Sequence, residues 1–152
     1  TPAAGALPGA TAPAAPPVAP RKKPQRDLAT DPKALRARVH AELRAFVQAL
    51  AEGEYEEAAR SIRQGESEAW DGVRLAAEVR HYQGAHGEIR FDPARVRGHH
   101  TTVKGIAPRV FRAQHALLDA EGEEQGFVEG EVDLREARDP EGPLVRLLGI
   151  RP

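Results

Sequence analysis

The sequence contains no cysteine and no methionine, and aromatic residues make up only 5% of its 152 residues. The absence of cysteine excludes disulfides, thiolate zinc sites and thiol nucleophiles. No apolar run approaches the roughly 20 residues that a membrane-spanning helix needs, and the opening residues lack the features of a signal peptide. We therefore expect a cytoplasmic protein that does not contact membranes. Because the sequence starts at Thr1 rather than Met, we also expect a piece of a longer protein.

Residues 1–30 differ in composition from the remainder. Seven of the 13 prolines lie at or before Pro24, and mostly small residues separate them. Such a segment buries too little apolar surface to offset the entropy of ordering, so we predict a disordered linker. Near its end stands a short basic patch made of Arg21, Lys22, Lys23 and Arg26. We interpret the patch as a solvated linker end, and the alternative is a weak contact with nucleic-acid phosphates.

Charge is distributed unevenly between the linker and residues 31–152. The whole chain has 22 basic and 23 acidic residues, and four of the basic ones but a single acidic one fall in the linker. Residues 31–152 therefore carry a net charge of about −4. Nucleic-acid-binding domains usually show a basic excess or stripe. The totals show neither, although a local patch could hide inside them.

The sequence pattern of residues 31–152 predicts a single α+β domain that begins with three helices. Asp31 and Pro32 suit the start of the first helix, and Gly53 suits its end. A second, short helix is predicted over residues 54–63. The third follows Trp70, with a cap at Asp71 and an end at Gly84 or Gly87. The apolar face predicted for the first helix is Leu35, Val39, Leu43, Phe46, Val47 and Leu50, and that of the third is Val73, Ala76, Val79 and Tyr82.

The pattern changes to strands after residue 87. A short β-like stretch is predicted at Glu88–Phe91, and longer strands at 100–106, 109–118, 126–134 and 144–150. The short turns between the later strands make them antiparallel. We expect the three helices to cover one face of a curved antiparallel sheet of four to five strands. The other face should meet water, and Glu129, Glu131 and Asp133 fall on it.

Two family resemblances accompany this pattern. The order of helices and strands resembles the α+β cone of the nuclear transport factor 2-like superfamily. The blocks VHAELRAFVQALAEGEYEEAARSI, HGEIRFDPARVR, FRAQHALLDAEGE, FVEGEVDL and DPEGPLVRLLGI, with Trp70 before the third helix, resemble an uncharacterised C-terminal domain of bacterial DEAD/DEAH-box superfamily 2 helicases. Where that family more often has a Trp, this sequence has Phe127.

The helicase resemblance implies a non-catalytic accessory domain that modulates the core or contacts nucleic acid or a partner. The linker would join it to a helicase core in the same polypeptide, and that core would use ATP and Mg²⁺. This chain has no G-x-x-x-x-G-K-[ST] phosphate loop and no DEAD or DEAH tetrapeptide, so we expect no ATP chemistry here. The alternative is a cone-fold domain that binds or transforms a small molecule between helices and sheet. A third interpretation is a homodimer formed through the sheet.

No catalytic residue and no metal site is predicted. The residues expected to line a pocket between helices and sheet are Trp70, Tyr82, Phe111 and His115. His115 shares an apolar face with Phe111, so it either forms a hydrogen-bonded core residue or lines the pocket. Trp70 either covers the edge of the core or anchors a partner. His99-His100 lacks the spacing of zinc ligands, and we interpret it as a polar loop before a strand.

The acidic residues Glu129, Glu131 and Asp133 recur at strand spacing. We interpret them as a solvated sheet face, because a half-exposed strand requires such alternation. The alternative is an electronegative surface that docks a basic partner.

Overall fold

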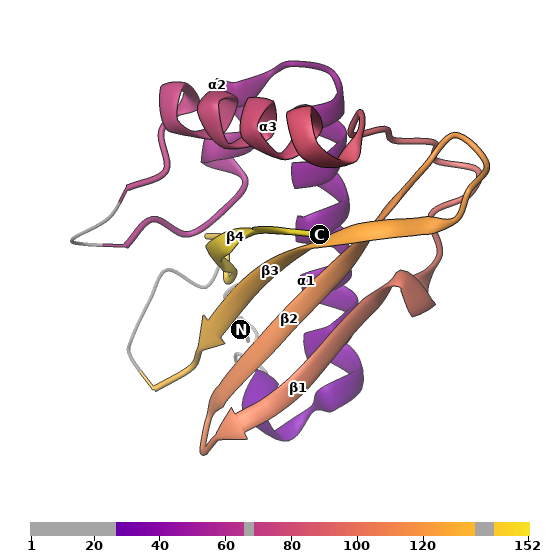
Figure 1. The fold of residues 1–152 in the computed structure, drawn as a ribbon. Helices are drawn as coiled ribbons and strands as arrows, with labels where there is room; N and C mark the ends of the chain where they lie inside the picture. The colour runs from indigo at the N-terminus through magenta and orange to yellow at the C-terminus, as the bar shows by residue number, and fades with distance from the viewer. Residues whose placement is uncertain (1–26, 66–68, 136–141) are drawn as a thin grey trace, which may run out of the picture.

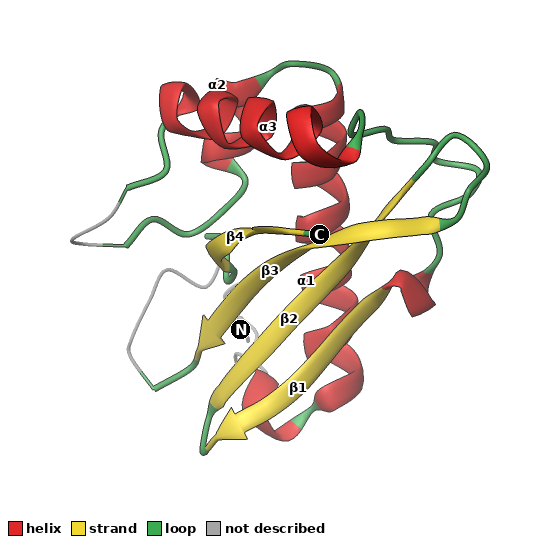
Figure 2. Ribbon diagram, in the orientation of Figure 1, coloured by secondary structure: helices red, strands yellow, loops and turns green. Residues whose placement is uncertain are grey.

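The computed structural model of the chain describes residues 27–65, 69–135 and 142–152. The predicted linker with Arg21, Lys22, Lys23 and Arg26 lies almost entirely outside these residues. The described elements are η1 (Leu28–Thr30), α1 (Pro32–Ala51), α2 (Tyr55–Arg60), α3 (Gly72–His86), η2 (Gly98–His100), β1 (Thr101–Ala107), β2 (Val110–Leu118), β3 (Glu124–Asp133) and β4 (Arg146–Arg151). Figures 1 and 2 show their arrangement. The α+β class and the three helices are confirmed.

The four described strands form one open antiparallel sheet in the order β1-β2-β3-β4. Thr101, His115, Val128 and Ile150 are aligned in one row across it, and all four are buried. This row belongs to the inner face, which α1 covers behind β1 and β2 in Figure 1. The register shifts once in each strand pair. Such bulges bend a strand and increase its twist, so each pair contributes to the curvature of the sheet.

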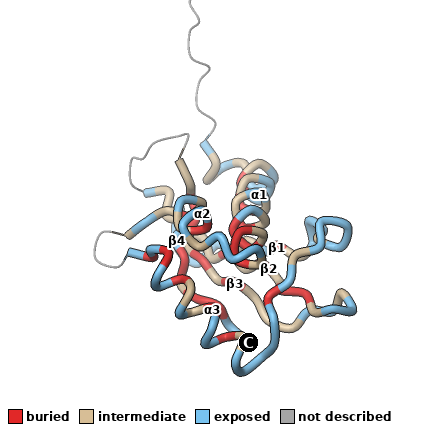
Figure 3. Tube along the Cα trace, turned by 90° about the horizontal axis from the view of Figure 1, so that it is seen from above, coloured by how far each residue is buried: buried red, intermediate tan, exposed pale blue. Residues whose placement is uncertain are grey.

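The first helix forms as its sequence predicts. The Asp31 side chain accepts a hydrogen bond from the Ala34 amide at 3.1 Å, and Pro32 occupies the first turn. All six predicted apolar positions are buried. The chain then turns at Gly53, whose φ of +74° suits glycine. Figure 3 shows buried positions on all three helices.

The third helix is capped as predicted, and Val79 and Tyr82 of its predicted apolar face are buried, but Val73 was assigned to that face wrongly. The Asp71 carboxylate accepts from the Arg74 amide at 2.8 Å, and the helix ends at Gly87. Val73 is 77% exposed, whereas Leu75 is fully buried. The buried positions are Gly72, Leu75, Val79 and Tyr82. The buried face of α3 is therefore rotated relative to the predicted one, and it places Gly72 against α2. A Cβ on Gly72 would lie 2.7 Å from the Glu56 carboxyl carbon, so any larger residue would push Glu56 aside.

Glu88–Phe91 is not a strand, which corrects the prediction. Ile89 in this segment is buried, but its amide donates to the Gln83 side chain at 2.9 Å. The Glu88 carbonyl accepts from the Gln125 side chain at 3.1 Å. Two side-chain amides thus replace the neighbouring backbone that a strand would need.

The last strand is shorter than predicted for a similar reason. Leu144 and Val145 are buried before β4, and both of their amides donate to one carboxylate oxygen of Glu42 on α1, at 2.8 and 3.1 Å. The Val145 carbonyl accepts from the Arg63 amide at 2.7 Å. This segment therefore binds to the helical layer and joins the sheet only at Arg146.

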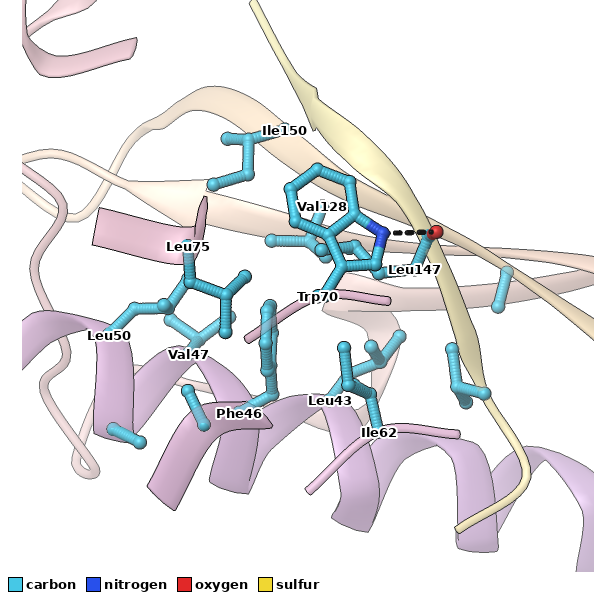
Figure 4. Packing of buried hydrophobic residues seen from close by; sticks show 14 of the residues in the cluster. Leu43, Phe46, Val47, Leu50, Ile62, Trp70, Leu75, Val128, Leu147 and Ile150 are labelled. Atoms are coloured by element: carbon cyan, nitrogen blue, oxygen red, sulfur yellow. Dashed lines mark hydrogen bonds between the residues drawn. The ribbon is translucent and has the colours of Figure 1, made fainter. Parts of the chain in front are cut away.

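Trp70 covers one edge of the core. Its side chain is buried, and its indole N–H donates to the Leu147 carbonyl at 3.1 Å (Figure 4). The guanidinium of Arg74 lies 3.8 Å from the centre of the ring. With 6% of its surface exposed, Trp70 acts as a core residue and not as an exposed anchor.

The close approach of β3 to Val145 leads to a stability prediction. A Cβ on Gly130 would collide with the Val145 side chain and lie 3.1 Å from the Arg146 carbonyl oxygen. We expect Gly130→Ala to lower the free energy of unfolding by about 1–3 kcal/mol, because overpacking forces the neighbours to move. Chemical denaturation measures this change.

A second variant at the contact and a control test the cause. Val145→Ala removes the colliding methyl groups, so the double variant should lose less than the sum of the two single variants. Gly84→Ala is the control, because that exposed helical position has nothing within 4 Å of a new Cβ. It should stabilise the fold by about 0.5–1 kcal/mol. Strict additivity of the two single variants would contradict the proposed collision.

Candidate functional site

A chain of three polar side chains links α1 to the inner face of the sheet. The hydroxyl of Thr101 on β1 lies 2.7 Å from Nδ1 of His40 on α1 and 2.7 Å from Nδ1 of His115 on β2. The two imidazole rings lie 5.7 Å apart, centroid to centroid. Because one hydroxyl has one hydrogen to donate, it donates to one ring and accepts from the other. The tautomers of His40 and His115 are therefore coupled through Thr101.

His115 is an uncharged hydrogen-bonding residue in the core. Its side chain is fully buried, and Nε2 has no hydrogen-bond partner in the described structure. Burial, followed by the positive charge of His40, His100 and Arg44, lowers its pKa to about 4. No described hydrogen bond joins it to a carboxylate. A group with this pKa and these partners is a weak general base at neutral pH.

Three arginines and three histidines near His115 form what we call the cationic cluster: Arg36, His40, Arg44, Arg97, His99 and His100. Arg36 donates to the carbonyls of Thr101 and Gly98, at 3.2 and 2.8 Å, and so attaches η2 to α1. Arg44 lies over the Phe91 ring, with its guanidinium carbon 5.2 Å from the centroid. None of the three arginines forms an ion pair with a carboxylate within the described residues.

The histidines of the cluster sit in a positive field. Burial, followed by Arg44, Arg36 and His100, lowers the pKa of His40. The pKa of His100 is also lowered, by burial and by the nearby His99 and Arg97, although Glu124 opposes the shift. His99 and His100 stand in the 3-10 turn before β1 with ring centroids 4.1 Å apart, in agreement with a polar loop. An anion placed here would lower the repulsion among these groups.

On the outer face of the sheet, in contrast to the cationic cluster, basic side chains are paired with acidic ones. Glu129 accepts hydrogen bonds from Gln114 and Arg151 at 3.2 Å, and Arg112 lies 3.6 Å away. Glu131 pairs with Arg146, and Asp133 with Arg135. The predicted acidic stripe is therefore balanced by arginines and forms a mixed-charge solvated face.

His115 also lines a cavity of about 320 Å³, which we call the His115 cavity. The cavity lies between α1, the segment 90–96 and the end of β2. Arg95 forms an ion pair with Asp92 at 3.4 Å and donates to the Ala120 carbonyl at 2.9 Å. The lining is Val47, Arg90, Phe91, Asp92, Arg95, Val96, His115, Ala116, Leu118, Asp119 and Ala120.

The four predicted pocket residues do not share a cavity. Trp70 lines a shallower hollow of about 790 Å³, whose lining includes residues that adjoin the undescribed segments 66–68 and 136–141. Tyr82 and Phe111 line neither hollow. The Tyr82 hydroxyl is buried against Gly126 and has no hydrogen-bond partner among the described residues. Phe111 is partly buried and packs against the core. Of the four, only His115 belongs to the site.

Sequence reasoning missed His40, Thr101 and the three arginines. One signal was present: Arg36, His40 and Arg44 recur every four residues, which places them on one side of α1. The contribution of Thr101 depends on the strand register, which no local pattern reveals. The predicted contacts Arg21, Lys22, Lys23 and Arg26 lie outside the described residues.

The part of the chain that the structure describes holds neither a metal-ligand cluster nor a helix suited to a bilayer. Within these residues, no group of three or more His, Asp and Glu side chains is arranged to hold a metal ion. Among the described helices, none combines the length and the apolar character needed to cross a membrane.

Comparison with known proteins assigns the chain to a family. A family model described as "Domain of unknown function (DUF3516)" matches residues 6–150. This chain belongs to the DUF3516 family. The match starts inside the predicted linker and includes all of the cationic cluster and the His115 cavity. No curated protein and no solved structure matches the chain.

The hydroxyl bridge of this DUF3516 domain can be tested by Thr101→Val. Valine keeps the shape of threonine but leaves Nδ1 of His115 buried without a partner, so we expect a loss of about 1–3 kcal/mol in the free energy of unfolding. The control is Thr102→Val on the exposed face of the same strand, which should change stability by less than about 0.5 kcal/mol. Equal effects in urea denaturation would contradict the bridge.

The lowered pKa of His115 predicts acid sensitivity. Between the ordinary value of 6.5 and about 4, the unfolded chain binds a proton that the folded chain excludes. Stability from this residue is therefore complete above pH 6.5 and is lost as the pH falls toward 4, by up to about 3 kcal/mol. Denaturation from pH 7.5 to 4 measures the slope.

His115→Asn tests this assignment, because asparagine keeps an amide near Thr101 but does not titrate. Its unfolding free energy should fall less steeply with pH in the same interval. His81→Asn, at an exposed position on α3, serves as the control. An unchanged slope in the His115 variant would assign the acid sensitivity to other groups.

Proposed function

We propose that this chain is a non-catalytic accessory domain of an ATP-dependent DEAD/DEAH-box helicase and that it contacts nucleic acid through the cationic cluster. The helicase assignment rests on the sequence resemblance, and membership of the DUF3516 family is compatible with it. ATP and Mg²⁺ would bind the helicase core of the same polypeptide. The predicted linker would leave the domain free to reach nucleic acid near that core.

The cationic cluster is the observation that carries the nucleic-acid contact. Residues 31–152 have a net charge of about −4, so unpaired arginines on one side of the molecule are a local exception. On the outer face of the sheet, arginines lie beside glutamates. In the cluster, Arg36, Arg44 and Arg97 contact carbonyl groups or an aromatic ring, which leaves their charge uncompensated. Phosphate groups supply the missing negative charge.

We further propose that the fold is a nuclear transport factor 2-like cone. The order of elements supports this proposal, since a helical hairpin and a third helix precede an antiparallel meander. The three register shifts also support it, because such irregularities bend strands. The fold itself does not select a function, because such architectures carry many unrelated sites.

The His115 cavity favours a second candidate function, the binding of a small molecule between helix and sheet. Its volume of about 320 Å³ falls at the lower end of the range for ligand sites. We place this function second because the cluster beside the cavity provides several unpaired cations, which a neutral small molecule would leave unused.

Substitution within the cluster tests the nucleic-acid contact. The double variant Arg97→Gln/His99→Gln removes two exposed side chains of η2 and its flank without touching the core. We expect its affinity for single-stranded oligonucleotides at low salt to fall about 3- to 10-fold. The salt slope of log Kd should decrease by about 0.7 for each phosphate that the variant no longer neutralises. Fluorescence anisotropy with the 152-residue chain measures both quantities.

The control is Arg80→Gln, which removes one exposed charge from α3, a helix that packs on α2 and β4 instead of β1. This variant should bind as the original chain does. If both variants lose affinity equally, the contact is a diffuse charge effect. If the original chain does not bind oligonucleotides, the proposed function is wrong.

A further inference from the structure

We propose that the His115 cavity accepts one unstacked base of a single-stranded nucleic acid whose phosphates lie on the cationic cluster. This inference rests on the proposed function and adds to it a definite ligand, a nucleobase, and a definite place for it. The structure offers four supports: the charge balance of the cavity, its aromatic wall, the unpartnered nitrogen of His115, and the continuity between cavity and cluster.

The lining of the cavity suits a base better than a phosphate. The lining contains two arginines, Arg90 and Arg95, and two aspartates, Asp92 and Asp119, so its formal charges cancel. Arg95 is already paired with Asp92, and Asp119 accepts hydrogen bonds from the amides of Glu121 and Glu123. A phosphate would gain little from such a neutral site. A base, by contrast, offers both donors and acceptors on its edge and needs both in return.

An aromatic side chain forms part of the wall. Phe91 lines the cavity and is partly buried against the core, and the guanidinium of Arg44 lies on its ring. Aromatic rings and arginine planes are the groups on which proteins stack unpaired bases. Stacking does not depend on base identity, so Phe91 provides affinity and the polar groups provide any preference.

His115 provides a polar atom without a partner. Its Nε2 is buried and makes no hydrogen bond in the described structure, whereas Nδ1 is fixed by the Thr101 hydroxyl. Buried polar groups normally have a partner, and each exception needs an explanation. We take the explanation to be a ligand, because His115 is among the residues that line the cavity. The bond to Thr101 fixes the orientation of the ring.

Cavity and cluster are continuous along the chain. Val96 lines the cavity, and the next residue, Arg97, belongs to the cluster, followed by His99 and His100. On the other side, Arg44 of the cluster rests on Phe91 of the cavity wall. A single strand can therefore place successive phosphates on the cluster while one base turns inward. A duplex keeps its bases stacked and would have to extrude one.

The test separates the base from the backbone. One oligonucleotide carries abasic sites throughout, and a matched one keeps a single adenine among abasic sites. We expect the original 152-residue chain to bind the adenine-containing strand about tenfold more tightly, with the same salt slope for both. Phe91→Leu should bring the ratio of the two affinities to about one. The ratio is the readout because Arg44 of the cluster loses its ring contact in this variant, which affects both strands alike.

Phe127→Leu is the matched control. Phe127 is half-buried on β3 in the row that faces away from α1, and it does not line the cavity. It should keep the tenfold difference. NMR of the ring nitrogens gives a second measurement that needs no variant: the His115 Nε2 signal should shift with the adenine-containing strand and not with the abasic one.

The outcomes distinguish this inference from the proposed function. Equal binding of both strands by the original chain, with the Arg97→Gln/His99→Gln variant still weakened, would overturn the base site and leave the nucleic-acid contact standing. Failure of both strands to bind would overturn both. Tighter binding of free adenosine monophosphate than of the adenine-containing strand would also overturn the inference, since the cavity would then hold a free nucleotide.

Discussion

The packing of α1 across the inner face of β1 and β2 is the contact on which the rest of this domain depends. Each fully buried Leu, Val or Phe of the α1 stripe contributes about 1.5–3 kcal/mol, and together these residues fix the rotation of the helix. The same rotation turns Arg36 and His40 toward η2 and β1, and Arg44 toward Phe91. The position of the cationic cluster is thus a consequence of core packing.

Local signals in the sequence predicted α1 and both helix caps, because a cap needs only a few neighbouring residues. Local signals failed where the structure depends on a contact with a residue far away in the sequence. Nothing near Val73 shows that α2 contacts α3 at Gly72, and nothing near Ile89 shows that side-chain amides replace a strand. His115 was placed on the inner face by alternation, but its partners, Thr101 and His40, follow from strand register and helix rotation.

The net charge of the domain gives no indication of the cationic cluster, on which the proposed function depends. An acidic total argues against a nucleic-acid surface, yet Glu129 and Glu131 of the sheet are paired with cross-strand arginines. The arginines around η2 contact carbonyls and a ring, which compensates their hydrogen-bonding groups but not their charge. Because arginines pair with glutamates on one surface and not on the other, the domain has a negative net charge and still presents a site for anions.

The bond from Glu42 to the amides of Leu144 and Val145 has a consequence for synthesis of the chain. A carboxylate on the first long helix accepts hydrogen bonds from backbone amides, the first of which is added 102 residues later. The amino-terminal helix must therefore leave the ribosome well before its final partners exist, with its apolar stripe uncovered in the meantime. During that interval the apolar stripe is open to aggregation, and addition of the closing segment completes the sheet.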